Sequence, residues 1–312
     1  MFKSNSFTWY FNLFKNRLNG NEIMKGVLRM ELLIAILPAI FWGSQVLITM
    51  KIGGGAYSQT LGTAIGALAF SLVIYFTVQP ELSWLIFGVG FVSGLFWAIG
   101  QGNQLIAVNN IGVSKAMPIS TGLQLVGTAL FGVIVFHEWK TTTAIILGVI
   151  AIACILVGII FTSKDDHDEE GKANFKKGMI TLLISTAGFI GYAVIARFFE
   201  VTSWELVLPQ AIGMGVGALA LTMRHNPFNK YALLNIIPGL VWAAGNLFLF
   251  ISQPKVGVAI SFSLSQCGVI ISTLGGIFLL GEKKTKKQLI YIAIGILLII
   301  AGVAMLGITK NN

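Results

Sequence analysis

The sequence reads GLFWAIGQGNQLIAVNNIGVSKAMPIS at residues 94–120 and GLVWAAGNLFLFISQPKVGVAISFSLS at residues 239–265. At a constant offset of 145 residues, 9 of the 27 positions are identical, among them Trp97 with Trp242 and Ser120 with Ser265. The tryptophan, glycine and serine matches matter most, because shared hydrophobic composition alone produces matches of leucine, isoleucine and valine. A repeat within a hydrophobic chain is typical of secondary transporters, whose substrate site lies where the two copies face each other.

The composition indicates an integral membrane protein. Of the 312 residues, 55% are hydrophobic and 11% are charged, and the mean hydropathy is +0.83, whereas a soluble domain would carry about 25% charged residues. Apolar runs long enough to span a bilayer, about 20 residues each, continue from Met30 to Lys310. Helices are expected because backbone groups in hydrocarbon must be satisfied within their own segment. The sequence lacks the alternating strand pattern of a barrel.

These runs predict an all-α integral membrane protein with ten transmembrane helices. The expected spans are 31–50, 57–78, 83–107, 112–136, 143–162, 178–198, 204–223, 231–252, 256–280 and 288–308. The chain then divides into a first five-helix repeat (30–162), a charged inter-repeat loop (163–177) that we expect to be a solvated linker, and a second five-helix repeat (178–312). Because each repeat has an odd number of spans, the second crosses in the opposite sense, which predicts an inverted repeat.

The N-terminal extension, residues 1–29, differs from the rest of the chain. It holds five basic residues against the single acidic Glu22, together with six aromatic residues. It lacks the apolar core and the cleavage site of a signal peptide. Two interpretations stay open: a basic amphipathic helix on the membrane surface, or a mis-assigned start, with translation beginning at Met30, which opens directly on a span.

The distribution of basic residues among the loops can indicate how the protein is oriented in the membrane. Without residues 1–29, the loops on one side of the membrane carry 12 lysines and arginines and those on the other side carry 4. The positive-inside rule would then place both chain ends outside. Counting residues 1–29 changes the tally to 12 against 9, so both orientations stay open, whereas the two ends are expected on one face.

We expect neither a metal site nor a cofactor. The histidines His137, His167 and His225 are scattered and have no ligand spacing. The two cysteines, Cys154 and Cys267, fall inside predicted spans and are expected to be packing residues. An intramembrane enzyme would need a catalytic pair or a metal set at matched depth, which the sequence lacks, and a scaffold would have little reason to repeat amides in both halves.

Polar side chains cluster at corresponding places in the two halves, and such groups usually face a cavity or a partner helix. Trp97 lies four residues before Gln101, and Trp242 lies four residues before Asn246, so each pair shares one helical face. A sugar ring offers hydroxyls to amides and an apolar C–H face to tryptophan, whereas a charged substrate would require buried charges. The predicted substrate-binding residues are Trp42, Gln45, Trp97, Gln101, Gln124, Gln210, Trp242, Asn246 and Gln266.

Structural roles for these residues also stay open. Serine, threonine and amide side chains hydrogen-bond between membrane helices, and tryptophans can anchor a chain at the membrane interface. Pro118 and Pro209, which lack an amide hydrogen, are expected to loosen their spans beside Ser120 and Gln210. Broken helices of this kind often mark binding sites, although a plain kink is the alternative.

Four segments carry a family resemblance: LLIAILPAIFWGS (32–44), IGVSKAMPISTGLQLVGTALFGVI (111–134), NIIPGLVWAAGNLFLFISQPKVGVAISFSLSQ (235–266) and STLGGIFLLGEKK (272–284). With them, the chain resembles the bacterial glucose/ribose uptake family of the drug/metabolite transporter superfamily, and looks most similar to glucose uptake proteins of low-GC Gram-positive bacteria. The resemblance covers about Met30 to the C-terminus.

The resemblance implies ten helices in two related halves and proton-linked import of a monosaccharide, such as glucose, across the bacterial cytoplasmic membrane without ATP. The implied partners are a small neutral sugar, a proton and the lipid bilayer, with no nucleic acid. Two alternatives remain: uptake of ribose rather than glucose, and export of amino acids or other metabolites, as elsewhere in the superfamily.

Proton coupling would need a carboxylate that titrates as the site changes access. The candidates are Glu205, five residues before Gln210, and Glu138, which ends the fourth predicted span. Glu282 ends the ninth span at the point equivalent to Glu138. We expect a glutamate at such a position to be solvated or paired with the lysines that follow it.

Overall fold

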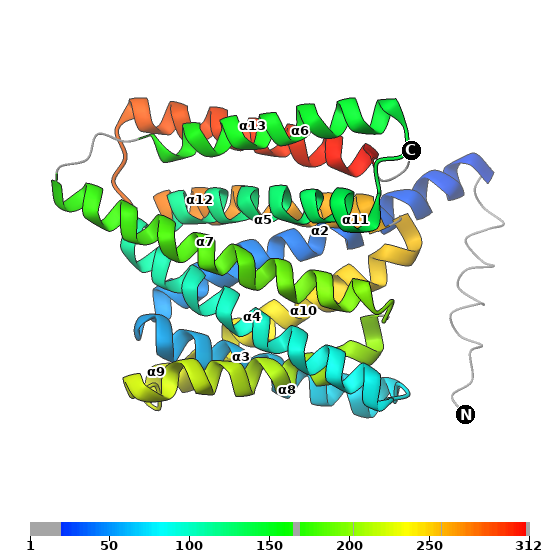
Figure 1. The fold of residues 1–312 in the computed structure, drawn as a ribbon, viewed down its shortest axis with the longest axis horizontal. Coiled ribbons are helices and arrows are strands. Elements are labelled where there is room, and N and C mark those ends of the chain that lie inside the picture. The colour runs from blue at the N-terminus through cyan, green and yellow to red at the C-terminus, as the bar shows by residue number, and fades with distance from the viewer. Residues whose placement is uncertain (1–19, 165–168, 202, 257, 310–312) are drawn as a thin grey trace.

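The computed structural model describes residues 20–164, 169–201, 203–256 and 258–309, and within these ranges it contains helices and loops but no strand (Figure 1). Ten helical segments are long and apolar enough to cross a membrane, as the hydrophobic runs predict. They are Met30–Ile52, Gly55–Val78, Trp84–Ile111, Val113–Phe136, Thr142–Ser163, Ala173–Phe198, Trp204–His225, Lys230–Val256, Ser261–Phe278 and Lys286–Thr309. The predicted all-α membrane fold is therefore confirmed.

The helices carry the labels of Figure 1. They are α2 (Gly20–Ile52), α3 (Gly55–Val78), α4 (Trp84–Ile111), α5 (Val113–Phe136), α6 (Thr142–Ser163), α7 (Glu169–Phe198), α8 (Ser203–Thr222), α9 (Lys230–Leu234), α10 (Ile236–Val256), α11 (Val258–Gln266), α12 (Gly268–Phe278) and α13 (Lys286–Thr309).

Two helices extend beyond the predicted spans. Helix α2 begins at Gly20, so residues 20–29 continue the first span, while residues 1–19 of the N-terminal extension lie outside the described part. Helix α7 begins at Glu169, so residues 169–177 of the predicted loop are helical. Hydropathy alone misses both extensions because it marks only the part of a helix that lies in hydrocarbon.

The interruptions in the spans differ from those that the prolines predict. Pro118 and Pro209 both lie inside continuous helices. The eighth and ninth spans are broken instead, at Asn235 and at Cys267. The amide of Asn235 donates to the carbonyl of Tyr231 (2.8 Å) and to that of Gly53 (3.1 Å), which ties this break to the turn between α2 and α3.

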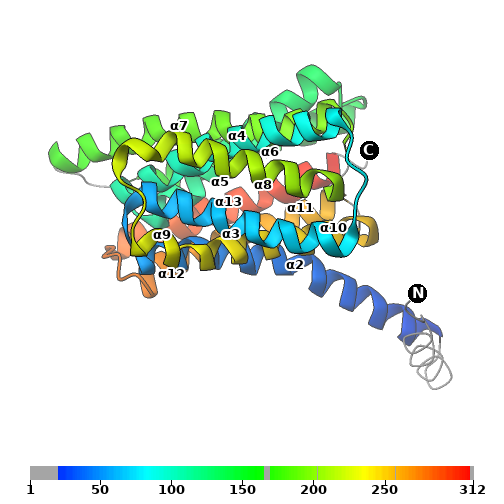
Figure 2. The ribbon, with the colours of Figure 1, turned by 90° about the horizontal axis from the view of Figure 1, so that it is seen from below.

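The helices pack in matched pairs. When spans 1–5 are equated with spans 6–10, the contacts of α3 with α8, of α5 with α12 and of α6 with α13 each join counterparts. Likewise, α4 packs on α7 and α8, while its counterpart α10 packs on α2 and α3. Helices α4 and α10, which carry the repeated sequence, run in opposite directions (Figure 1). Figure 2 shows α3 and α8 on one side of the bundle.

Glycines allow these matched helices to touch backbone to backbone. A Cβ atom at Gly94 of α4 would lie 2.1 Å from the carbonyl oxygen of Gln210 in α8. At its repeat counterpart, Gly239 of α10, a Cβ atom would lie 2.4 Å from the carbonyl oxygen of Thr63 in α3. Small residues permit this close approach in membrane proteins. The two contacts fix the positions of α4 and α10 in the bundle. They therefore also fix the positions of the side chains that these two helices direct toward the centre.

Candidate substrate cavity

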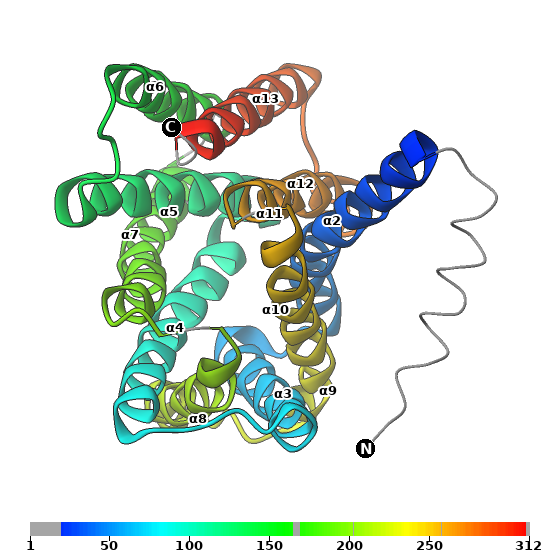
Figure 3. The ribbon, with the colours of Figure 1, turned by 90° about the vertical axis from the view of Figure 1, so that its right-hand side faces the viewer.

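A cavity of about 1200 Å³ lies at the centre of the bundle. Its lining comes from α2, α4, α5, α7, α8, α10, α11 and α12, which surround the centre in Figure 3, and none of its described lining residues comes from α3, α6 or α13. Both five-helix halves contribute to the lining. All nine residues predicted to bind substrate lie on its wall: Trp42, Gln45, Trp97, Gln101, Gln124, Gln210, Trp242, Asn246 and Gln266.

The described lining residues of the cavity extend to one face of the bundle. We call this the open face; it carries the loops at 79–83, 137–141 and 199–201, and the opposite face, which carries the link between α6 and α7, is the linker face. Phe136, Arg197 and Glu200 line the cavity at the open face. Toward the linker face its wall reaches Gln104 and Met117, and among the described residues it includes none from the linker-face loops. This shape suits a site that a ligand enters from one side.

The two repeated tryptophans meet at the cavity wall. The rings of Trp97 and Trp242 pack edge to face, with centroids 5.1 Å apart and an interplanar angle of 60°. Trp97 is 1% exposed, whereas Trp242 is partly exposed. The main role of Trp97 is therefore to hold the ring of Trp242 in place by packing against it. The indole of Trp42 donates to the carbonyl oxygen of Trp242 (3.2 Å). These tryptophans therefore lie inside the bundle, away from any interfacial belt.

Most of the cavity amides use their NH₂ groups within the protein. Gln210 donates to the hydroxyl of Ser93 (2.9 Å), which in turn donates to the carbonyl oxygen of Tyr192. The repeat-matched serines Ser120 and Ser265 each accept from neighbouring glutamines. The donors are Gln104 (2.7 Å) and Gln124 (2.9 Å) to Ser120, Gln266 (3.2 Å) to Ser265, and Gln45 (3.2 Å) to Thr49. Gln104 and Gln210 thus join neighbouring helices. The other three amides bond within their own helices, and all five line the cavity.

Two cavity amides, Gln101 and Gln253, form no side-chain hydrogen bond with the residues that the structure describes. Gln101 is the buried one of the two, at 3% exposure, whereas Gln253 is partly exposed. Both the NH₂ and the carbonyl of Gln101 are therefore available to a ligand that enters the cavity.

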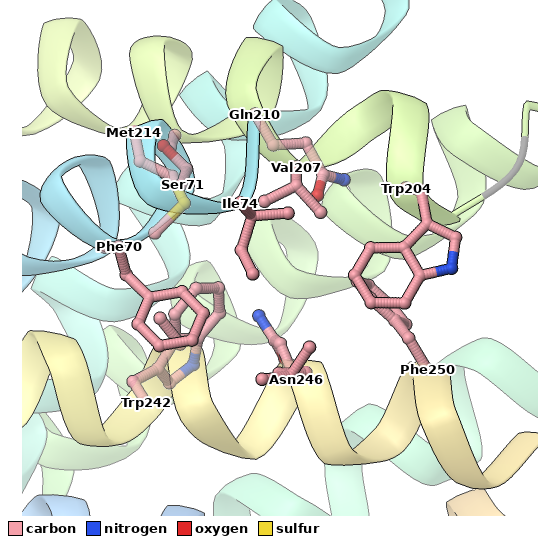
Figure 4. Close-up of a pocket in the computed structure, with 14 residues that line it drawn as sticks. Phe70, Ser71, Ile74, Trp204, Val207, Gln210, Met214, Trp242, Asn246 and Phe250 are labelled. Atoms are coloured by element: carbon pink, nitrogen blue, oxygen red, sulfur yellow. The ribbon is translucent and has the colours of Figure 1, made fainter. Parts of the chain in front are cut away.

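A smaller cavity of about 30 Å³ adjoins the large one between α3, α8 and α10 (Figure 4). It has room for about one or two water molecules. Gln210 and Asn246 project into it from facing helices, and Trp204 and Phe250 lie at one end. Gln210, Trp242, Asn246 and Phe250 line both cavities. A molecule in either cavity can therefore contact Asn246 and Gln210.

The sequence interpretation missed the contribution of α7. Phe189 and Tyr192 line the cavity, and both pack, as Trp242 does, against the hydrophobic cluster that contains Trp97. The Tyr192 hydroxyl interacts with the side chain of Asn246. A second comparison would have drawn attention to this helix, because residues 39–46 and 187–194 are identical at four of eight positions at an offset of 148.

Tyr192→Phe is expected to raise the KM for the monosaccharide that the family resemblance implies about 3- to 10-fold, because one neutral hydrogen bond at the site is lost. The maximal rate should change little, since the ring and its packing remain. Sugar uptake by proteoliposomes measures both parameters. Tyr291→Phe in α13, which does not line the cavity, is the matched control. Equal KM values for the two variants would show that the Tyr192 hydroxyl does not contribute to substrate binding.

The charged groups lie near the mouth of the cavity. Glu138 forms an ion pair with Arg197, whose guanidinium lies over the ring of Phe136 at 4.4 Å from the centroid. Glu205 is in the first turn of α8, partly buried, and is not among the lining residues. Glu138 is thus connected to the cavity wall through Arg197. The described residues contain no group of three histidine, cysteine or acidic side chains able to hold a metal ion.

Comparison with known proteins supplies relatives over nearly the whole chain. The "Probable glucose uptake protein GlcU" of Priestia megaterium is 65% identical over 286 residues, which cover 90% of this chain and 100% of the relative. The "Glucose uptake protein GlcU" of Bacillus subtilis (strain 168) is also 65% identical, covering 91% and 100%. A "Putative sugar uptake protein" of Bacillus cereus is 56% identical, covering 90% and 100%.

A solved structure described as "Crystal structure of protein" shares the fold, with a TM-score of 0.59 over 89% of this chain and 96% of that chain, at 16% sequence identity. The sequence profile of the family described as "Sugar transport protein" matches residues 33–309. These relationships and the ten apolar helices identify a multi-pass protein of the cell membrane and confirm the family resemblance. The chain belongs to the sugar transport protein family.

Proposed function

We propose that this protein takes up a neutral monosaccharide, foremost glucose, across the cytoplasmic membrane by alternating access, in symport with a proton. The observation that carries the proposal is the central cavity, where six of the nine predicted binding residues are amides and three are tryptophans. The names of the relatives, glucose uptake protein and sugar uptake protein, support the same substrate class.

The chemistry of the cavity suits a neutral polyol. Amides can donate to and accept from sugar hydroxyls, and aromatic rings such as Trp242 offer an apolar surface to the ring C–H groups. Among the described lining residues, the charged ones are Arg197 and Glu200, which lie at the mouth. An amino acid would need charged partners for both its amino and its carboxylate group deep in the site. The lining therefore supports sugar uptake over amino-acid export.

The alternating-access part of the proposal rests on two inverted halves that change places around the site. The matched helix pairs, the opposite directions of α4 and α10, and the contact of Trp97 with Trp242 support this relation. The cavity reaches the open face and ends before the linker face, as one of two alternating states should. Rocking of one half against the other would open the linker face and close the open face.

Uptake of labelled glucose by proteoliposomes tests this function. We expect saturable uptake that an inward proton gradient stimulates, with competition by unlabelled glucose stronger than by ribose. Uptake that the gradient leaves unchanged would indicate a facilitator, and stronger competition by ribose would reassign the sugar. Absence of sugar uptake together with efflux of preloaded amino acids would contradict the proposal in favour of an exporter.

Glu138→Gln is expected to abolish accumulation of sugar above its external concentration while exchange of internal for external sugar continues. The reason is that a glutamine cannot bind and release the coupling proton at the Glu138–Arg197 pair. Glu205→Gln tests the second candidate in the same assay, and Glu81→Gln, an exposed glutamate on the same face, is the control. Normal accumulation by both the Glu138 and the Glu205 variants would assign the coupling to another group.

A further inference from the structure

A glutamate from the second half holds the start of a helix from the first half at the linker face. Glu282 follows α12, and its carboxylate accepts hydrogen bonds from the first backbone groups of α5. The N–H of Val113 donates to Oε1 (2.5 Å), and both the N–H of Ser114 (3.2 Å) and its hydroxyl donate to Oε2. Because the N-terminus of a helix carries a positive partial charge, it favours this anion. The expectation that Glu282 is merely solvated or lysine-paired is therefore incomplete.

Two glycines, Gly112 and Gly276, leave space for the carboxylate of Glu282. Gly112, with φ of +81°, separates α4 from α5, and a Cβ atom there would lie 3.0 Å from the carboxylate atoms. A Cβ atom at Gly276 would lie 3.2 Å from Oε1. The side chain of Glu282 is 18% exposed, and the ammonium of Lys284 lies 3.8 Å from Oε2. Burial lowers the pKa of Lys284, while the Glu282 carboxylate acts in the opposite direction.

The position of this contact matches the closed end of the cavity. The cavity wall ends at Gln104 and Met117, and Met117 lies about one turn into α5 from Val113. The contact therefore joins the two halves between the end of the cavity and the linker face. At the open face, the repeat counterpart Glu138 pairs with Arg197 at the mouth of the cavity. The two equivalent glutamates thus have different partners at the closed end and at the open end.

We propose that Glu282 is the gate residue of the linker face. Its carboxylate, bound to the N-terminus of α5, holds the cavity closed at that face, and its release lets α5 and α12 separate so that the cavity opens there. The proposal rests on the alternating-access part of the proposed function. It adds the residue that stabilises one of the two states.

Sided labelling of one cysteine tests the gate without any sugar. The background is the full chain with Cys154→Ala and Cys267→Ala, and Met117→Cys reports from the inner end of the cavity. A membrane-impermeant thiol reagent is applied to intact cells and, separately, to inverted membrane vesicles, so that each face is probed in turn. With Glu282 present, we expect fast labelling from one face, the open face, and slow labelling from the other.

Glu282→Gln should raise the labelling rate from the slow face about 10- to 100-fold, because a neutral amide loses the charge-assisted part of three hydrogen bonds, and it should lower the rate from the fast face. Ser114→Ala, which removes one donor, should change the same ratio in the same direction by a smaller factor. Lys283→Gln, an exposed neighbour, controls for the loss of one charge and should leave the ratio unchanged.

Two outcomes would overturn the gate. In one, the ratio of the two rates stays the same in both Glu282→Gln and Ser114→Ala; in the other, the rates rise equally from both faces, which would mean general loosening. Because the reporter needs no substrate, these outcomes are distinct from a failure of glucose uptake, which would contradict the proposed substrate and leave the gate measurement standing.

Discussion

Gln101→Leu is expected to reduce kcat/KM for glucose about 10- to 100-fold, which corresponds to the loss of one or two hydrogen bonds to a buried amide. Gln101 is the buried one of the two cavity amides, Gln101 and Gln253, whose side chains form no hydrogen bond within the described part of the protein. Leucine has nearly the same size, so the empty protein should be as stable as before. A loss of transport without a loss of stability is what a ligand-binding role predicts. Initial uptake rates in proteoliposomes, together with a thermal unfolding curve, measure the two quantities.

The matched control for Gln101 lies two residues along the same helix. The amide of Asn103 donates to the carbonyl oxygen of Ile99 (2.9 Å) within α4, and Asn103 is not among the cavity-lining residues. Asn103→Leu should therefore leave kcat/KM close to the wild-type value. Equal transport by the two leucine variants would show that the Gln101 amide does not contact the sugar.

Gly94→Val is expected to destabilise the folded protein by about 3 kcal/mol, because overpacking at a rigid contact forces helices apart. A Cβ atom at this position would meet backbone atoms of α8: the Gln210 carbonyl oxygen at 2.1 Å and the Met214 nitrogen at 2.7 Å. A backbone cannot move aside as a side chain can. The yield of monodisperse protein from size-exclusion chromatography and the midpoint of thermal unfolding in detergent should both fall.

Gly88→Val provides the control in the same helix, since a Cβ atom at Gly88 meets nothing within 4 Å. Its stability should lie within about 0.5 kcal/mol of the wild type, as is usual for a surface substitution. If the Gly94 variant were as stable as the Gly88 variant, α4 and α8 would not be packed backbone to backbone. The position of the cavity amides on α4 would then have to be revised.

The sequence predicts the number and approximate position of the helices because hydrocarbon requires long apolar segments with internal hydrogen bonds. It predicts less well where the helices break. The break at Asn235 depends on a hydrogen bond to Gly53, far away in the chain, and Gly268, just after the break at Cys267, packs against Ala39 of α2. Proline, a local signal, is accommodated inside α5 and α8.

The repeat also predicts which residues face the centre, since depth and helical face can be read from spacing. The structure brings all nine predicted residues to one cavity; their binding of sugar stays a prediction. Spacing could not reveal the hydrogen-bond partners of each amide. Ser120 of α5, for example, accepts a hydrogen bond from Gln104 of α4 as well as from Gln124 of its own helix, and the first of these bonds forms only when α4 and α5 pack together. Spacing also could not reveal that Trp97 is buried or that Glu282 binds the N-terminus of α5, because both depend on contacts between helices far apart in the sequence.

A structure of the full chain determined with glucose would show whether a neutral sugar binds between the two halves. We expect one sugar molecule in the cavity, with hydroxyl groups within hydrogen-bonding distance of Gln101 and Asn246 and with the ring against Trp242. An empty cavity at saturating glucose, or glucose bound only outside the wall formed by α4 and α10, would contradict this expectation.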